Sequence, residues 1–385
     1  MLNFDFYNPT HIVFGKDRLD SLKTLIPKEA KVLITYGGGS IKKFGTLDKI
    51  LNILSDKDVF EFGGIEPNPQ FETLMKAVEI VKEKNIDFLL AVGGGSVMDG
   101  TKFIALAANY SGNALDLLTP EFDLAPVDKA IPIGTIVTLP ATGSEMNNGA
   151  VISHKGIKVP VFSMHTFPKF SILDPTLTFT LPKTQVANGI IDTFIHTVEQ
   201  YITFPVDARF QDRTAEGILQ TLIEIAYTTL NEPTNYDARA NLVWCATMGL
   251  NGLIGAGVPQ DWTTHMIGHE LTAMFGIDHG KTLAVLQPAI WEIRKEKKWK
   301  KLLQYAERVW NINNGSEEEK INLAIRKTRD FFESLGVNTK LSSYGIDESQ
   351  IDNILQALKN NKRTHLSETG DLTLDVSKEI LLRAL

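Results

Sequence analysis

Four of the eight histidines of the chain and one aspartate lie in two short segments. Asp192 and His196 are four residues apart in the run NGIIDTFIHTVEQY, and His265, His269 and His279 follow in DWTTHMIGHELTAMFGIDHGKT. Imidazole and carboxylate groups together form the ligand set of a divalent transition metal. The two segments therefore predict a metal site, although a lone histidine on an apolar helix is more often a hydrogen-bonded core residue.

The first segment has the pattern of a buried helix. Residues 185 to 201 carry many apolar side chains and contain no proline. Side chains at positions i and i+4 share one face of a helix, with Cβ atoms roughly 5–6 Å apart. Asp192 and His196 can therefore bind the same ion.

The second segment predicts a helix over residues 263 to 275, with His265 and His269 on one face. Gly276 is expected to end this helix, because glycine reaches the left-handed conformation that a helix stop requires. His279 would then lie on the loop just beyond. A zinc protease is not expected, because the motif H-E-x-x-H places the glutamate between the histidines and Glu270 follows His269.

Length and composition are those of a packed globular protein. The chain has 385 residues, 43% hydrophobic and 22% charged, which is enough for two domains. A net charge of −7 gives no reason to expect nucleic-acid binding, and the basic run at residues 294 to 301 is expected to be a solvated helix face. The single Cys245 excludes an intramolecular disulfide and suits a reducing compartment. With no signal peptide or membrane-length apolar run, we expect a cytoplasmic protein without a membrane partner.

The pattern of apolar residues changes along the chain. Expected strands at residues 31–36, 58–63, 87–93 and 131–140 alternate with expected helices at 73–84 and 96–110. Such alternation indicates an α/β fold with a parallel sheet. From about Leu181 onward amphipathic helical stretches dominate, without convincing strands. We therefore expect an α/β domain over residues 1–180 and a helical domain over residues 181–385.

Two glycine loops of similar sequence follow expected strands, Gly37-Gly38-Gly39-Ser40 and Gly93-Gly94-Gly95-Ser96. A glycine turn between a strand and a helix lets backbone amides approach a phosphate. Ser96 is also a candidate N-cap for the helix that it opens. Neither loop matches G-x-G-x-x-G, and two tight turns that simply need glycine are the alternative.

A hydroxyl-rich turn ends the next strand, with Thr138, Thr142 and Ser144 in TLPATGSE. Ligands of open α/β folds bind at such carboxyl edges. A cluster of caps and turns is the alternative. We do not favour the interpretation that residues 37 to 40 bind the pyrophosphate of NAD and that Glu61 accepts hydrogen bonds from its ribose.

With these motifs together, the chain resembles the iron-containing (group III) alcohol dehydrogenases, and most of all their NADPH-dependent butanol dehydrogenase and aldehyde reductase branch. The similarity runs through THIVFG, EFGGIEPNP, AVGGGSVMDGTKF, TLPATGSE and GAGVPQDWTTHMIGHELTA. It implies an N-terminal Rossmann-like dinucleotide-binding domain, a C-terminal all-helical domain and an active site in the cleft between them. A homodimer is also expected.

The resemblance assigns roles to individual residues. Asp192, His196, His265 and His279 would bind one iron(II) or zinc ion, and His269 is a candidate proton relay or a structural histidine. Cofactor-binding positions would be Gly94, Gly95, Ser96, Asp99, Thr138, Thr142, Ser144 and Lys158. Lys158 lies in KGIKVPVFSMHTFPK, a loop that is shorter than in similar enzymes.

The loop after the first expected strand argues for NADP(H). NAD-dependent relatives usually carry an aspartate there, whereas residues 36 to 43 of this chain contain Gly37, Gly38, Gly39, Ser40 and Lys43 but no acid. Charge-assisted hydrogen bonds to a 2′-phosphate would each contribute about 1.5–3 kcal/mol.

The expected activity is hydride transfer from NADPH to short and medium-chain aldehydes, reversible as an alcohol dehydrogenase. One alternative is an NAD-linked polyol dehydrogenase of the same fold. A second is a lyase like dehydroquinate synthase, which would need a cluster of lysine and arginine for a sugar phosphate.

Overall fold

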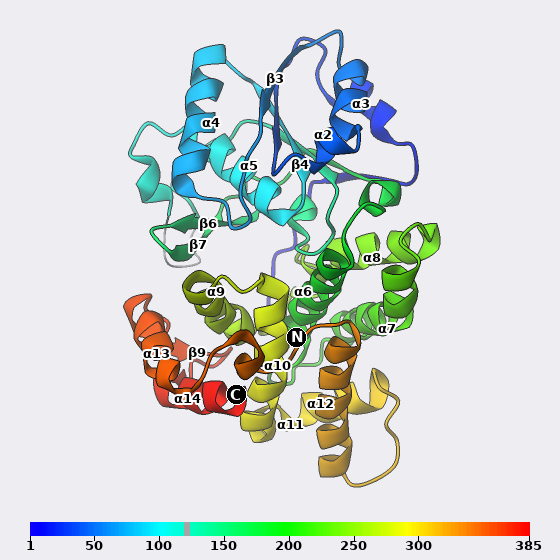
Figure 1. Ribbon diagram of the computed structural model, residues 1–385, viewed down its shortest axis with the longest axis vertical. Coiled ribbons are helices and arrows are strands. Elements are labelled where there is room, and N and C mark those ends of the chain that lie inside the picture. The colour runs from blue at the N-terminus through cyan, green and yellow to red at the C-terminus, as the bar shows by residue number, and fades with distance from the viewer. Residues whose placement is uncertain (119–123) are drawn as a thin grey trace. The chain divides into compact units, whose positions relative to one another are not determined.

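The computed structural model describes residues 1–118 and 124–385 (Figure 1). The chain divides into two compact units. Tyr7–Leu181 and Pro233–Thr247 form one of them, called here the sheet unit. Met1–Phe6, Pro182–Glu232 and Met248–Leu385 form the other, the helical unit.

The sheet unit is built on a six-stranded sheet in the order β1-β8-β5-β4-β2-β3, in which every pair of neighbours is parallel. The strands are β1 His11–Phe14, β2 Lys31–Tyr36, β3 Asp58–Phe62, β4 Phe88–Gly93, β5 Ile133–Val137 and β8 Phe170–Leu173. All residues of β4 and β5 are buried, as expected for strands covered on both faces. The four strands predicted from the sequence are present, and β1 and β8 add a short pair at one side.

Helices cover both faces of this sheet. α4 (Phe71–Lys84) and α5 (Gly95–Ala107) share one core with inward residues such as Leu89. α1 (Leu22–Leu25) and α3 (Thr46–Ile53) share the opposite core with residues such as Leu90. The alternation of Leu89 and Leu90 between two cores is the period-two pattern of a strand. This is the doubly covered parallel α/β arrangement that the sequence predicts.

Smaller elements complete the sheet unit. β6 (Gly149–His154) and β7 (Ile157–Phe162) form an antiparallel hairpin, and α2 (Ser40–Lys43) follows the first glycine loop. Most of α8 (Tyr236–Gly249) also belongs here. Short 3-10 turns in the chain are η1 Leu19–Ser21, η2 Ala114–Leu117, η3 Ser144–Met146, η4 Pro175–Thr178, η5 Leu341–Tyr344 and η6 Glu348–Gln350.

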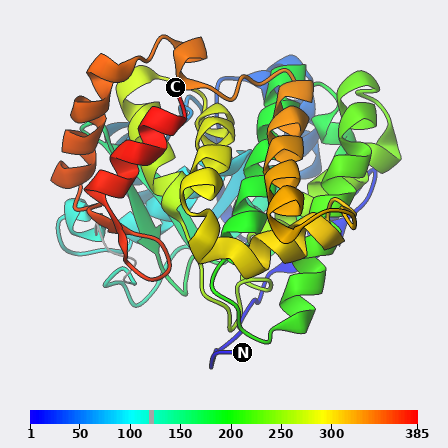
Figure 2. The same cartoon turned by 90° about the horizontal axis from the view of Figure 1, so that it is seen from below.

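The helical unit contains long helices that lie side by side (Figure 2). They are α6 Lys183–Tyr201, α7 Arg209–Asn231, α9 Thr263–Phe275, α10 His279–Ile293, α11 Lys295–Arg308, α12 Glu317–Ser334, α13 Ile351–Asn360 and α14 Leu374–Arg383. Residues of α9, α10, α13 and α14 form one apolar core, which includes Ile267, Leu286 and Ile354. The sequence indicates no strand here, but β9 (His365–Leu366) and β10 (Leu372–Thr373) form a two-residue antiparallel pair. Such short strands leave no periodic signal.

The basic run at residues 294 to 301 is not wholly solvated, which corrects the sequence-based expectation. Arg294, Lys298 and Lys301 are only 8%, 3% and 4% exposed. Their spacing of four and three residues places them on one face of a helix, and acidic partners meet that face. Within residues 1–118 and 124–385, no helix is long and apolar enough to cross a membrane.

Candidate metal and cofactor sites

Asp192 lies at the centre of a histidine cluster in the helical unit. Its Oδ1 is 3.6 Å from Nε2 of His196, 3.6 Å from Nε2 of His265 and 3.7 Å from Nε2 of His279. These separations exceed ordinary hydrogen bonds. They are near the roughly 3.4 Å that separates two ligand atoms bound about 2.1 Å from a tetrahedral metal ion. The structure thus brings Asp192, His265 and His279 together as a group that could hold a metal ion, and the fourth predicted ligand, His196, lies beside Asp192.

Burial and charge in this cluster also fit a cation. Asp192 Oδ1 and His265 Nε2 are buried and have no hydrogen-bond partner among the described residues, a costly state unless a ligand satisfies them. Burial raises the pKa of Asp192, but the neighbouring histidines outweigh it and hold that pKa well below its ordinary value. Burial lowers the pKa of His265, but Glu199 and Asp192 outweigh it and raise that pKa to about 9. A positive charge is therefore favoured at this point, as a divalent metal ion would supply.

His279 reaches the cluster from a helix and not from a loop, which corrects the sequence-based expectation. Gly276 ends α9 in the left-handed conformation, with φ of 66°, as predicted. The backbone oxygen of Asp278 already accepts from the amides of Lys281 and Thr282, so α10 begins at His279. A Cβ on Gly280 would lie 2.8 Å from the backbone oxygen of Asn188, so glycine permits the approach of α10 to α6.

His269 lies beside the cluster, one helical turn after His265. Its ring centroid is 5.3 Å from that of His279 and 6.2 Å from that of His265. The ring of Trp262 stands edge-on, 5.5 Å from the His265 ring and 6.2 Å from the His196 ring. The surroundings of the ligands are therefore partly aromatic.

Glu199 is a member of the site that the sequence analysis missed. It lies three residues after His196 and seven after Asp192, so the three share one face of α6. Its carboxylate contacts Nδ1 of His265, the ring nitrogen opposite the one that faces Asp192. The helical spacing of the three residues could have revealed it.

The second glycine loop packs directly against the hydroxyl-rich turn of the sheet unit. A Cβ on Gly94 would lie 3.0 Å from Cβ of Leu139, and a Cβ on Gly95 would lie 2.5 Å from Cγ2 of Thr142. The Thr138 amide donates to the Gly93 carbonyl at 2.9 Å. The second glycine loop and the hydroxyl-rich turn therefore meet at the N-terminus of α5, and the N-terminus of a helix favours anions such as a pyrophosphate.

The predicted N-cap role of Ser96 is wrong. Gly94 holds the N-cap position of α5, with an extended backbone, and Ser96 already lies within the first turn. The Ser96 hydroxyl instead accepts from the Asn68 amide at 3.3 Å. Ser96 thereby connects the second glycine loop to the segment before α4.

Asp99 turns inward beneath these loops. One of its oxygens accepts from the Ser144 hydroxyl at 2.7 Å, and the other accepts from the Val151 amide at 2.9 Å. Burial raises the pKa of Asp99, and nearby Lys102 and Lys158, on β7, oppose that rise. Asp99 thus connects the loop to the β6–β7 hairpin through its own contacts.

Lys102 is a second residue that the sequence analysis missed. Its ammonium group donates to Ser144 Oγ at 2.9 Å, to Asn147 Oδ1 at 2.8 Å and to the Gly149 carbonyl at 2.8 Å. Lys102 is fully buried, and burial lowers its pKa to about 8. Lys102 lies three residues after Asp99 on α5, and this helical spacing could have indicated that the two side chains lie on the same face.

The first glycine loop has an open side and an acidic neighbour. Gly39 has φ of 93°, and a Cβ on Gly38 would meet no atom of the described residues within 4 Å. Lys42 Nζ lies 3.1 Å from Glu61 Oε2, which also accepts from the Tyr36 hydroxyl at 3.0 Å. Lys43 Nζ lies 5.4 Å from the centre of the Phe44 ring. The tertiary structure thus brings Glu61 next to a loop that contains no acid of its own.

A parallel sheet with glycine loops at the carboxyl ends of its strands is typical of a dinucleotide-binding enzyme, and a buried histidine and aspartate cluster is typical of a metal site. The comparison of sequences identifies the family. The profile described as iron-containing alcohol dehydrogenase matches residues 9–175, and that of the C-terminal part of the Fe-containing family matches residues 186–384. The chain belongs to the iron-containing alcohol dehydrogenase family.

Individual relatives match nearly end to end. The chain is 58% identical to the NADPH-dependent aldehyde reductase YqhD of Escherichia coli, over 99% of both chains. It is 40% identical to the NADH-dependent butanol dehydrogenase A of Clostridium acetobutylicum, over 94% of this chain and 95% of the relative. The crystal structure of Escherichia coli YqhD superposes with a TM-score of 0.97, covering 100% of this chain and 99% of that one.

Proposed function

We propose that this protein is a metal-dependent aldehyde reductase that uses NADPH and also oxidises alcohols. The observation that carries the proposal is the convergence of three imidazole Nε2 atoms on Oδ1 of Asp192 at 3.6–3.7 Å. The 58% identical relative is named an NADPH-dependent aldehyde reductase, which supports the same activity.

Asp192, His196, His265 and His279 would hold one iron(II) or zinc ion. When bound, this ion supplies a Lewis acid for the carbonyl oxygen of the aldehyde. His269 lies close enough to the ligands to be the proposed donor of the proton that the oxygen gains. The aldehyde carbon gains the hydride from the nicotinamide, so hydride and proton together give the alcohol.

Residues 1–180 are proposed as the dinucleotide-binding part and residues 181–385 as the metal-binding part. For the cofactor we propose Gly94, Gly95, Ser96, Asp99, Thr138, Thr142, Ser144 and Lys158, with Gly37, Gly38, Gly39, Ser40 and Lys43 at the adenosine end. The close packing of Gly95 on Thr142 supports this grouping, because it brings the second glycine loop and the hydroxyl-rich turn together at the start of α5.

NADPH is proposed over NADH because Lys42 neutralises Glu61 beside the first glycine loop. A neutralised carboxylate repels a 2′-phosphate less than a free one, and Lys43 adds a further cation. The Clostridium relative is named an NADH-dependent enzyme, so cofactor preference is the property that separates the two possibilities.

Short and medium-chain uncharged aldehydes are the proposed substrates. The aromatic ring of Trp262 beside His196 and His265 favours apolar groups near the ligands. An apolar contact discriminates by only about 1–3 kcal/mol per methylene, so broad acceptance is expected.

The decisive experiment measures oxidation of NADPH and of NADH by protein of known metal content, with propanal, butanal, hexanal and a phosphorylated aldehyde. We expect the highest kcat/KM with NADPH and the uncharged compounds. A preference of more than about a hundredfold for the phosphorylated aldehyde exceeds what a few methylenes give and would favour a sugar-phosphate enzyme instead.

A homodimer is proposed as the form in solution. Leu2, Phe4 and Phe6 are 46%, 48% and 49% exposed, an unusual set of apolar side chains for a free surface. In the sheet formed by the described residues, β1 lies at an edge beside β8. Light scattering should give twice the mass of the chain, and Phe4→Ser with Phe6→Ser should lower it.

The cytoplasm is the proposed location. The chain has one cysteine, Cys245, which is buried, so its stability cannot depend on a disulfide within the chain. Cell fractionation of the producing organism with an antibody against the protein tests this proposal.

A further inference from the structure

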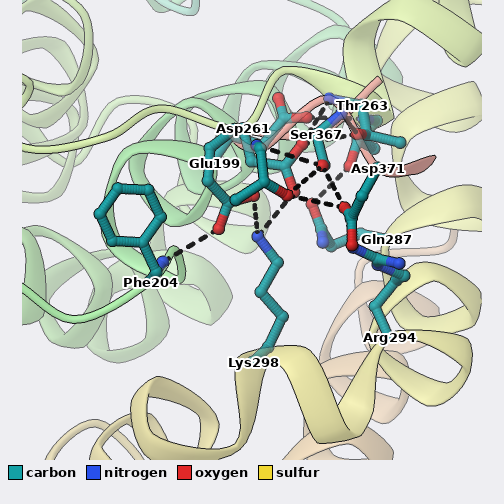
Figure 3. A network of polar contacts seen from close by, with 12 residues as sticks. Glu199, Phe204, Asp261, Thr263, Gln287, Arg294, Lys298, Ser367 and Asp371 are labelled. Carbon is teal, nitrogen blue, oxygen red and sulfur yellow. Dashed lines mark hydrogen bonds and ion pairs between the residues drawn. The ribbon is translucent and has the colours of Figure 1, made fainter. Parts of the chain in front are cut away.

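A buried set of charged groups lies beside His265, at the ring nitrogen opposite the one that faces Asp192. Figure 3 shows three of its members, Glu199, Asp261 and Lys298. The set begins with Glu199, whose carboxylate contacts His265 Nδ1. Oε1 of Glu199 also accepts from the backbone amides of Thr264 at 2.6 Å and of His265 at 3.3 Å. These contacts leave Glu199 one orientation, with its charge directed at the His265 ring.

Asp261 is the next member of this set of charged groups. Its backbone amide donates to the Glu199 carbonyl at 2.8 Å, and its Oδ1 accepts from the Thr263 amide at 3.0 Å. The start of α9, and with it His265 two residues further on, is therefore fixed against the end of α6.

Lys298, on α11, completes this set of charged groups, as Figure 3 shows. Its ammonium group donates to Asp261 Oδ2 at 2.8 Å and to Glu368 Oε2 at 2.5 Å. The other oxygen of Glu368 accepts from the Phe204 amide at 2.9 Å. The three side chains of Lys298, Asp261 and Glu368 are at most 7% exposed. Removal of Lys298 would thus leave two carboxylates buried without their cation, which a protein tolerates poorly.

We propose that Glu199, with Lys298 behind it, is a positioning group for the metal ligand His265. Glu199 accepts a hydrogen bond from Nδ1–H, which would leave the lone pair of Nε2 for a bound metal ion. The orientation and basicity of an imidazole ligand depend on such a partner. Lys298 holds Asp261 and the start of α9, so that the carboxylate and the ring stay aligned. This inference rests on the proposed ligand set.

The test uses Co²⁺ as the probe, because its visible absorption reports ligand geometry and its affinity can be measured against a chelator without any turnover. Glu199→Gln removes the charge and places an amide group among donors. We expect its affinity for Co²⁺ to fall about 10-fold to 100-fold, with an altered visible band. Lys298→Met should weaken Co²⁺ binding less. Lys300→Met, at an exposed position of the same helix, is the control and should bind as the wild type.

The outcomes separate this inference from the ligand assignment. Wild-type affinity and spectrum in Glu199→Gln would overturn the positioning role, provided that His265→Ala loses Co²⁺. Retention of Co²⁺ by His265→Ala would instead overturn the ligand set. Equal binding by Lys298→Met and Lys300→Met would remove Lys298 from the proposal. If circular dichroism shows that Glu199→Gln is unfolded, Glu199→Asp, which keeps the charge but is one methylene shorter, takes its place with the same expectation.

Discussion

Gly95 and Thr142 are packed so closely that a Cβ on Gly95 would lie 2.5 Å from Cγ2 of Thr142 and 2.6 Å from its Oγ1. Real Cβ atoms do not approach other atoms so closely, so this contact requires glycine. It joins the loop after β4 to the turn after β5, two segments more than 40 residues apart in the sequence.

The first prediction follows from this contact. Gly95→Ala should push the two loops apart at a cost of about 1–3 kcal/mol and raise the dissociation constants of NADPH and NADH alike. Fluorescence titration measures both constants. Gly217→Ala is the control, because a Cβ there meets no atom of the described residues within 4 Å and Gly217 lies in α7, outside the proposed cofactor positions, so binding should stay nearly unchanged. Wild-type binding of both cofactors by Gly95→Ala would place the pyrophosphate elsewhere.

The second prediction concerns the choice of cofactor. Gly38→Asp should raise the KM for NADPH about 10-fold to 100-fold more than the KM for NADH, because it adds a carboxylate where a 2′-phosphate is proposed. Gly39 is less suitable for this test, because its φ of 93° would strain any other residue. Lys43→Ala should act in the same direction. Equal changes in both KM values would mean that this loop does not bind the 2′-phosphate.

The third prediction separates the ligands from their neighbour. His265→Ala should lose tightly bound metal and turnover together, because it removes a ligand. His269→Ala should keep the metal and lose mainly kcat. Elemental analysis of the two purified variants, with their kinetics, decides between them. Stoichiometric metal in His265→Ala, or loss of metal from His269→Ala, would reverse the assignment.

The fourth prediction uses the buried Lys102. Burial lowers the pKa of Lys102 in the folded protein to about 8, below the ordinary value of 10.5. Between pH 8 and pH 10.5, Lys102 is therefore protonated in the unfolded chain and deprotonated in the folded protein. The free energy of unfolding should therefore rise with pH from about 8 to 10.5 in the wild type, by up to about 3 kcal/mol relative to Lys102→Met.

Urea titrations at pH 8 and pH 10 give this difference between the two proteins. Lys76→Met, which changes an exposed lysine of α4, is the control and should follow the wild type. Parallel pH dependence of the wild type and Lys102→Met would show that Lys102 keeps its proton in the folded protein over this range.

Local patterns in the sequence were sufficient for much of the fold. Buried apolar strands separated by amphipathic helices predict the parallel sheet, and the predicted stop at Gly276 is confirmed by its left-handed backbone. Asp192 and His196 could be paired from the sequence alone, because helical spacing places positions four apart on one face. Each of these inferences uses interactions within one segment.

Other features depend on segments that are distant in the sequence. Lys298 reads as part of a solvated basic run, yet it is buried because Asp261 and Glu368 meet it from two other segments. Glu61 is absent from the first glycine loop but lies beside it, because β3 pairs with β2 in the sheet.

By itself, the sequence predicted Asp192, His196, His265 and His279 as candidate ligands and the two helices that carry the first three, because residue type and helical period are local properties. The tertiary structure alone decided that three Nε2 atoms surround one oxygen of Asp192, and that Glu199 stands behind His265. The physical reason is that a charge is neutralised, and a ligand oriented, by atoms within a few ångströms in space, whatever their separation along the chain.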